Sequence, residues 1–301
     1  MKMQSRSRGL RELCRLLGYS PQAYYQYQKT SGKKALEADL LIGQVVFYRI
    51  RQPKIGCRKL YEMLQPFIAA HRMTIGRDSF FDLLRENDLL IKKSRRSGVR
   101  TTDSNHWMKK YPDLIKNIRL SRANELWVSD ITYIHLKKSG FAYLSLVTDA
   151  YSRKVVGFCV NDDLSANGPL AALEMALENR VNNKPLIHHS DRGSQYCSDG
   201  YTGLLKSGAI NISMTQSGDP RDNAIAERVN GILKQELLEE VYPNIKKARQ
   251  SVIRAIDTYN RIRPHSSVDM MTPDKAHKQT GPIKRRWKSW SDRNRKSEAL
   301  L

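Results

Sequence analysis

Three β-rich runs that follow one another closely constrain the fold of this chain more than any other feature. They cover residues 126–136, 141–149 and 155–160, and short turns such as Lys138-Ser139-Gly140 join them. Strands this close in sequence pair as antiparallel neighbours. The segments after them predict a helix with the apolar stripe Leu170/Leu173/Ala176/Leu177, a strand at 185–189, a helix at 199–206, a strand at 211–214, and helices at 223–239 and 246–259. This order predicts an α/β fold, a mixed five-stranded sheet flanked by helices.

The N-terminal region carries helical patterns instead of strands. Residues 12–17 and 22–28 are the first pair of expected helices, and Ser20-Pro21 supplies a cap and a first-turn proline for the second of them. Residues 58–64 and 77–85 are another such pair. Each pair fits a helix-turn-helix, and a small bundle with a structural or protein-contact role has the same pattern.

These patterns divide the chain into five expected segments. The run at 94–105 is polar, basic and without periodicity, which is typical of a linker. The segments are a helix-turn-helix-like segment at 1–36, a second helical, helix-turn-helix-like domain at 37–95, a linker at 96–110, the α/β core at 111–265 and a basic C-terminal tail at 266–301.

The net charge of +22 is unevenly distributed along the chain, and the distribution indicates which class of molecule the protein binds. Residues 1–110 hold 23 Lys and Arg against 9 Asp and Glu, and residues 241–301 hold 15 against 5. Residues 111–240 hold 14 against 16 and are therefore nearly neutral. Basic arms of this size favour a polyanion such as nucleic acid, whereas an ordinary solvated surface mixes both signs.

Composition excludes several other classes. No apolar run reaches the length of a membrane span, and the first residues lack the apolar stretch of a signal peptide, so we expect a cytoplasmic protein with no membrane partner. The cysteines are far apart and predict neither a disulfide framework nor a zinc site. They are Cys14, Cys57, Cys159 and Cys197.

Three carboxylates are the candidate catalytic residues. Asp130 lies inside a β-branched, apolar run, where an ionised side chain is costly unless it is paired or bound to metal. Asp191 follows the predicted strand at 185–189, and ligands bind at the carboxyl ends of such strands. Glu227 lies on the predicted helix at 223–239. Each residue also has an ordinary structural explanation when it is considered alone. Asp130 fits a surface-facing strand residue, Asp191 fits a turn, and Glu227 fits a solvated helix face.

The helix that carries Glu227 can be phased at about 100° per residue. One arc is apolar, and the opposite arc carries two amides, a carboxylate and an ammonium group. The apolar arc consists of Ile225, Val229, Ile232 and Leu233, and the polar arc of Asn223, Glu227, Asn230 and Lys234. The carboxylates of two Asp and one Glu are hard oxygen ligands that suit Mg²⁺ or Mn²⁺. Two such ions can stabilise the attacking and the leaving oxygen when a nucleophile displaces a group at phosphorus.

The spacing of the three carboxylates resembles a known signature. With 35 residues between Asp191 and Glu227, they are similar to the D, D-35-E pattern of retroviral integrases and related bacterial transposases. The longer motifs WVSDITY (127–133), HSDRGSQY (189–196), ERVNGILK (227–234) and YNRIRPH (259–265), with Thr272-Pro273, resemble the insertion-sequence transposases encoded by a second reading frame, OrfB. The resemblance covers roughly residues 45–280.

This resemblance implies a ribonuclease H-like core at 111–265, with two Mg²⁺ (or Mn²⁺) ions on Asp130, Asp191 and Glu227. Water would hydrolyse a phosphodiester at the element's end, and the freed 3′-hydroxyl would then attack a second phosphodiester. Lys234 matches the family's phosphate-contacting basic residue, and Asn223, Arg228 and Asn230 are further candidates for DNA contact.

The implied partners are double-stranded DNA, as element ends and target, and further copies of the chain in a homo-oligomer on that DNA, in the bacterial nucleoid. The resemblance also implies an upstream-frame (OrfA) fusion partner that supplies a leucine zipper, and this chain itself shows no sustained heptad run.

The competing hypotheses are a ribonuclease H-type nuclease without strand transfer and a DNA-binding regulator with an inactive core. A tyrosine recombinase would require a covalent protein–DNA adduct.

Overall fold

The computed structural model describes residues 9–91, 106–116, 118–138, 140–181, 184–216 and 223–286. Contacts divide the chain into two compact units, one formed by residues 1–50 and 60–90 and the other by residues 51–59 and 91–301. Most of the predicted linker at 96–110, and the part of the predicted tail beyond residue 286, lie outside the described residues. No helix in the described ranges is long and apolar enough to span a bilayer.

The first unit is helical, as predicted, but its second helix is far longer than expected. Its helices are α1 (Leu10–Leu16), α2 (Pro21–Arg51), α3 (Cys57–Ala70) and α4 (Arg77–Glu86). The hydroxyl of Ser20 accepts a hydrogen bond from the backbone N–H of Ala23 at 3.0 Å and so caps α2. Proline is absent from the rest of the helix, and α2 ends just before Gln52-Pro53, where the proline disfavours helical backbone. The predicted helix at 22–28 is therefore only the first part of α2, which also crosses the expected 36/37 boundary without a break.

The second unit is built on the predicted mixed sheet. Its main strands are β1 (Leu126–Leu136), β2 (Gly140–Asp149), β3 (Val155–Asn161), β4 (Ile187–Ser190) and β5 (Asn211–Met214). The order is β3-β2-β1-β4-β5; β1, β2 and β3 are antiparallel, and β4 and β5 run parallel to β1. A two-residue strand that the sequence did not predict, β6 (Val241–Tyr242), pairs with the end of β1. The predicted α/β class and sheet are confirmed.

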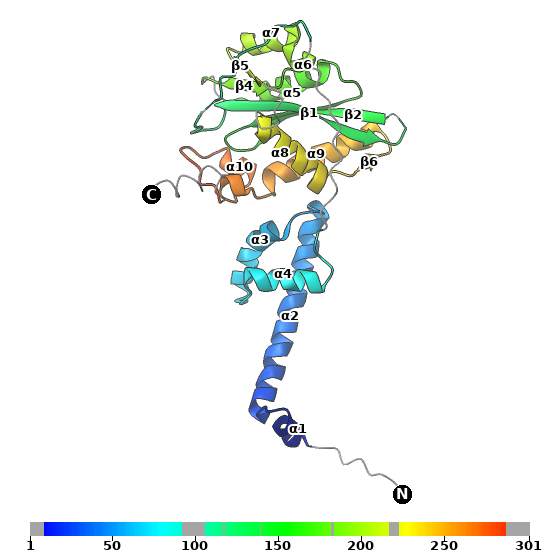
Figure 1. The fold of residues 1–301 in the computed structure, drawn as a ribbon, viewed down its shortest axis with the longest axis vertical. Coiled ribbons are helices and arrows are strands. Elements are labelled where there is room, and N and C mark those ends of the chain that lie inside the picture. Colours follow the sequence, from blue (N-terminus) through cyan, green and yellow to red (C-terminus); the bar gives the residue numbers. More distant parts are fainter. Residues whose placement is uncertain are drawn as a thin grey trace, which may run out of the picture. The chain divides into compact units, whose positions relative to one another are not determined.

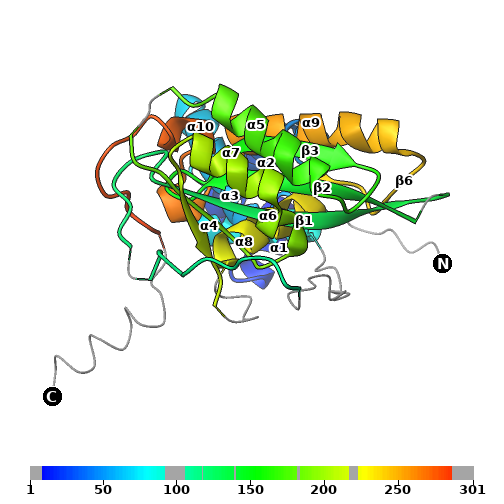
Figure 2. The ribbon, with the colours of Figure 1, turned by 90° about the horizontal axis from the view of Figure 1, so that it is seen from above.

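Helices cover both faces of this sheet (Figure 1). One face carries α5 (Asn167–Glu178), α6 (Ser194–Cys197) and α7 (Asp199–Ser207), which Figure 2 shows in front of the strands. The other face carries α8 (Ala224–Ile232), its π-helical continuation η2 (Leu233–Leu237) and α9 (Ile245–Arg261). At Gly157, β3 and α5 approach so closely that an added Cβ would lie 2.0 Å from the carbonyl oxygen of Ala172. Only glycine fits there.

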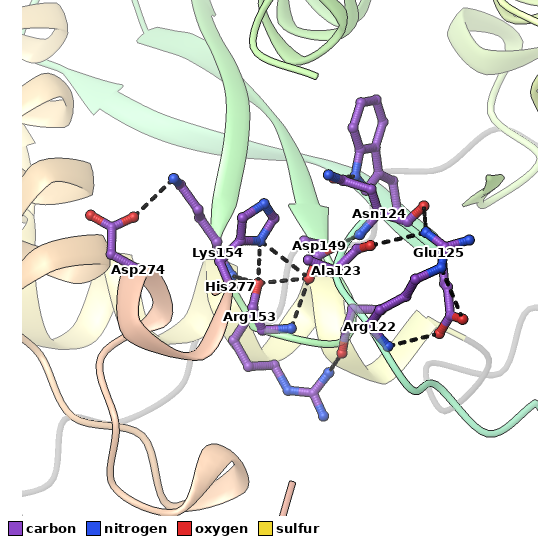
Figure 3. Close-up of polar contacts among 12 residues, drawn as sticks. Arg122, Ala123, Asn124, Glu125, Asp149, Arg153, Lys154, Asp274 and His277 are labelled. Atoms are coloured by element: carbon purple, nitrogen blue, oxygen red, sulfur yellow. Dashed lines mark hydrogen bonds and ion pairs between the residues drawn. The ribbon is translucent and has the colours of Figure 1, made fainter. Parts of the chain in front are cut away.

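A buried carboxylate joins the C-terminal segment to the sheet (Figure 3). Asp149, at the end of β2, accepts hydrogen bonds from the N–H groups of Asn124 and Ser152, both at 2.7 Å, and from the Ser152 hydroxyl at 2.6 Å. The same hydroxyl lies 2.9 Å from Nδ1 of His277. His277 follows α10 (Pro273–Ala276), which comes after the short 3₁₀ helix η3 (Ser266–Val268). The first part of the predicted tail, up to residue 286, thus includes folded elements that contact the core.

Candidate active site

Asp130 and Asp191 lie at neighbouring positions on adjacent parallel strands. β1 and β4 pair with Val128 opposite His189. Asp130 lies two residues after Val128, and Asp191 lies two residues after His189, directly beyond the end of β4. Neighbouring strands are about 4.8 Å apart. Both aspartates line one small cavity of about 20 Å³, together with Tyr196.

The electrostatics of Asp130 reflect this crowding. Burial and the negative charge of Asp191 raise its pKa to about 7, and the charge of Glu227 adds to the rise. Hydrogen bonds from Asn230 and from the N–H of Ile131, at 2.8 and 2.9 Å, act in the opposite direction. Gathered negative charge of this kind favours a proton or a cation between the carboxylates.

Glu227 is placed differently from the two aspartates. It lies in the first turn of α8 with an exposed side chain, and it does not line the cavity shared by Asp130 and Asp191. Across the ranges that the structure describes, no three His, Cys, Asp or Glu side chains stand close enough to hold a metal ion as they are oriented. The charge of Glu227 nevertheless raises the pKa of Asp130 further, so α8 holds the third carboxylate within electrostatic reach of this aspartate.

Two asparagines attach α8 to β1. The side-chain amide of Asn223 donates to the carbonyl oxygen of Ser129 at 2.9 Å, and that of Asn230 donates to Oδ2 of Asp130 at 2.8 Å. Both side chains are buried, and their amide oxygens make no hydrogen bond within the described residues. The predicted polar arc is therefore divided, because its two amides face the sheet whereas Glu227 is exposed.

The two basic side chains predicted to contact DNA, Lys234 and Arg228, lie in different environments. Lys234 is exposed on η2; burial of its stem lowers the pKa of the ammonium group, and the charge of Asp130 raises it. Lys234 thus lies within the electrostatic reach of the carboxylates. Arg228 is exposed on α8 and lines a separate cavity.

The loop after β4 holds the carboxylate of Asp191. The N–H of Gly193 donates to its Oδ1 at 2.9 Å, and an added Cβ on Gly193 would lie 3.1 Å from that oxygen. Gln195 donates to the carbonyl oxygen of Leu164 at 2.9 Å and so ties the loop to the segment before α5.

A buried polar network that the sequence analysis missed lies behind the aspartates. Nε2 of His188 is 2.7 Å from the hydroxyl of Ser129 and 2.9 Å from that of Tyr201. Burial and the adjacent His189 lower the pKa of His188 to about 3, so the ring is neutral. Both histidines are fully buried, and His189 contacts Ser213 at 2.8 Å. Strand alternation from Asp130 places Ser129 on the opposite face, a signal that could have suggested this network.

The chain is similar in sequence to known integrase-core proteins. Two family models, each described as "Integrase core domain", match residues 121–220 and 208–273. The chain is 33% identical over 267 residues to the insertion element IS600 uncharacterized 31 kDa protein of Shigella sonnei, covering 87% of this chain and 96% of that protein. It is 29% identical over 281 residues to the transposase for insertion sequence element IS629 of Shigella sonnei, covering 90% and 92%.

Among solved structures, the catalytic core domain of the HTLV-2 integrase in complex with magnesium is similar, with 21% identity and a TM-score of 0.41. The match covers 52% of this chain and 97% of that one. Since the IS600 relative is matched over nearly its whole length, the chain belongs to the IS3-family insertion-element transposases with an integrase core domain.

Proposed function

We propose that this chain cleaves a phosphodiester at the ends of an insertion element and joins the freed 3′-hydroxyl to DNA. The observation that carries the proposal is the pair Asp130, within β1, and Asp191, directly after the neighbouring parallel strand β4, which line one cavity. The charge of Glu227 acts on the same site. Membership of the transposase family supports phosphodiester chemistry as the purpose of this arrangement.

The donor set fits a hard divalent cation. Asp130, Asp191 and Glu227 offer carboxylate oxygens, and the amide oxygen of Asn230 has no hydrogen-bond donor within the described residues. Oxygen ligands without thiolates suit Mg²⁺ or Mn²⁺. We therefore propose that the three carboxylates hold two such ions, which supply charge stabilisation to the attacking and leaving oxygens. Glu227 would join the aspartates through a change of side-chain rotamer.

The residues around the carboxylates have supporting roles in this proposal. Asn230 orients Asp130 and favours its ionised form through the 2.8 Å hydrogen bond. Lys234 would contact a phosphate near the scissile bond, since it already lies in the field of Asp130. We propose double-stranded DNA as the substrate, bound by a homo-oligomer. The net charge of +22 supports a polyanionic partner.

The direct test uses a labelled duplex that ends in the element's terminal repeat, incubated with the full chain and Mg²⁺. Strand-transfer products support the transposase. Cleavage without joining would favour the ribonuclease H-type nuclease, and DNA binding without either reaction would favour the regulator.

Replacing Asn230 with alanine should slow cleavage by about 10- to 100-fold, since it removes a partner that orients a metal ligand. The acidic limb of the pH–rate profile should also move to higher pH, because the lost hydrogen bond lowers the pKa of Asp130 in the native protein. Rates measured between pH 6 and 9 check both effects. Asn179→Ala is the matched control, since Asn179 is exposed and bonds only the carbonyl oxygen of Met175. An unchanged rate and profile in Asn230→Ala would contradict the assigned role.

Mg²⁺ should raise the melting temperature of the DNA-free protein more at pH 8 than at pH 5.5. The pKa of Asp130 is raised from 3.8 to about 7, so its proton stabilises the fold fully below about pH 4, and this contribution is lost as the pH rises through 7. A metal ion must displace that proton, so its affinity should increase up to about pH 7 and then level off. Calorimetry across this range measures the shift. Asp130→Asn should remove the pH dependence of this Mg²⁺-induced shift. An equal shift at pH 5.5 and pH 8 in the native protein would contradict the proposal that Asp130 binds the metal.

A further inference from the structure

A second cavity, of about 670 Å³, lies beside α8 and shares no lining residue with the carboxylate cavity. Apolar side chains of α8, namely Ile225, Val229 and Ile232, form part of its wall. The end of α9 and the segment after it supply further lining residues, including Tyr259 and Ser267. Apolar walls reduce screening, so charges in this cavity act more strongly than they would in water.

The charged lining of this cavity is positive. Lys59, Arg153, Arg228, Arg263 and Arg285 line it, and no Asp or Glu does so within the described residues. Arg263 is neutralised by Glu236, to which it donates two hydrogen bonds at 2.9 and 2.7 Å. Glu236 also pairs with the ammonium group of Lys59 at 3.4 Å, so a single carboxylate faces two of these cations.

Two of these arginines are available for an anion. Arg228 is exposed and makes no hydrogen bond or ion pair with any residue that the structure describes. Arg153 donates to neutral oxygens, the hydroxyl of Ser267 at 3.3 Å and the carbonyl oxygen of Ala150. Burial, and to a lesser extent the like charge of Arg285, lower the pKa of Arg153, whereas Tyr259 and Asp149 act in the opposite direction.

The hydroxyl of Tyr259 provides an independent sign of a ligand. The side chain is fully buried and lines the cavity, yet its hydroxyl has no hydrogen-bond partner among the described residues. Burial raises the pKa of this phenol, so it keeps its proton and remains a donor. Its ring is held against His265, with ring centroids 4.6 Å apart. A buried donor of this kind normally has an acceptor.

We propose that this cavity binds a phosphate group through the guanidinium groups of Arg228 and Arg153 and the hydroxyl of Tyr259. A planar guanidinium donates two parallel hydrogen bonds to phosphate oxygens, and the phenol adds a third donor. The phosphate belongs either to a DNA backbone or to free inorganic phosphate. The binding is independent of metal and of the cleavage chemistry proposed above.

The test compares three variants of the full chain in the presence of EDTA. Arg228→Gln and Tyr259→Phe remove donors from the cavity. Arg254→Gln is the matched control, because Arg254 is an exposed cation on α9 outside the cavity. Calorimetric titration with inorganic phosphate forms one arm, and fluorescence anisotropy with a short duplex forms the other. Both cavity variants should weaken binding by about tenfold in at least one arm, whereas Arg254→Gln should change it little.

The two arms distinguish the sources of the phosphate. A selective loss for inorganic phosphate assigns free phosphate, and a selective loss for the duplex alone assigns a backbone phosphate. If the cavity variants behave as Arg254→Gln does in both arms, the proposal is wrong. Asp191→Asn should keep this phosphate binding, so failure of the proposed catalysis and failure of this site give different results.

Discussion

Asp191→Asn should lower both cleavage and joining by about a thousandfold while leaving DNA affinity within about twofold. Metal-assisted stabilisation of a phosphoryl displacement is worth several kcal/mol, and each 1.36 kcal/mol is a factor of ten in rate. The amide of asparagine has nearly the same shape as the carboxylate, and its oxygen can still accept the 2.9 Å hydrogen bond from Gly193. The loop should therefore keep its conformation, and only the charge is lost.

The control for this substitution is Asp162→Asn, since Asp162 is an exposed aspartate of the same unit outside the cavity. Single-turnover cleavage and strand-transfer assays with Mg²⁺, run beside anisotropy with EDTA, separate chemistry from binding. A variant that retained a tenth or more of the native rate would exclude Asp191 as a metal ligand. Equal melting temperatures would show that the fold is intact.

Glu236→Ala should destabilise the second unit by about 3–5 kcal/mol, the usual result of leaving one partner of a buried ion pair without the other. Arg263 is only 1% exposed, and Glu236 accepts both of its parallel hydrogen bonds, at 2.9 and 2.7 Å. Burial alone would raise the pKa of Glu236, but the hydrogen bonds and charge of Arg263 hold it below its usual value. The pair links η2 to the residues that follow α9.

Scanning calorimetry should show this loss as a fall of about 10 °C in the melting temperature of the unit. The exposed Glu240→Ala should change its stability by less than about 0.5 kcal/mol. The double variant Glu236→Leu/Arg263→Met should recover part of the loss, because it removes the unpaired charge of Arg263, whereas Lys59 still lacks the partner it has at 3.4 Å in the native protein. Similar melting temperatures for Glu236→Ala and Glu240→Ala would show that the pair contributes little.

The sheet could be predicted from the sequence because its strands have clear periodicity and short turns. The bounds of β1 at 126–136 and β5 at 211–214 agree with the prediction. The length of α2 could not be predicted, since its polar middle lacks an apolar stripe and contains Gly32, a residue type that commonly ends a helix. β6 was missed because two residues carry no periodicity.

The arrangement of the candidate site could also be predicted only in part from the sequence. The phase of α8 placed Asn223, Glu227 and Asn230 on one arc, but it gave no reason for two of them to turn toward the sheet. That orientation depends on hydrogen bonds to Ser129 and Asp130, which are far away in sequence. The buried role of Asp149 was also missed, although Asp followed by Ser three residues later is a common turn signature.

The position of Asp130 within β1 has a consequence for how the molecule opens. The strand pairs with β2 from Trp127 to Leu136, whereas β4 and β6 pair only with the two ends of its other edge, at residues 126–128 and 135–136. The main-chain amides near Asp130 that point toward β2 can therefore exchange with deuterated solvent only when β1 and β2 separate, which places them among the slowest-exchanging amides of the unit. Fraying at the surface of the unit would leave this central aspartate in register.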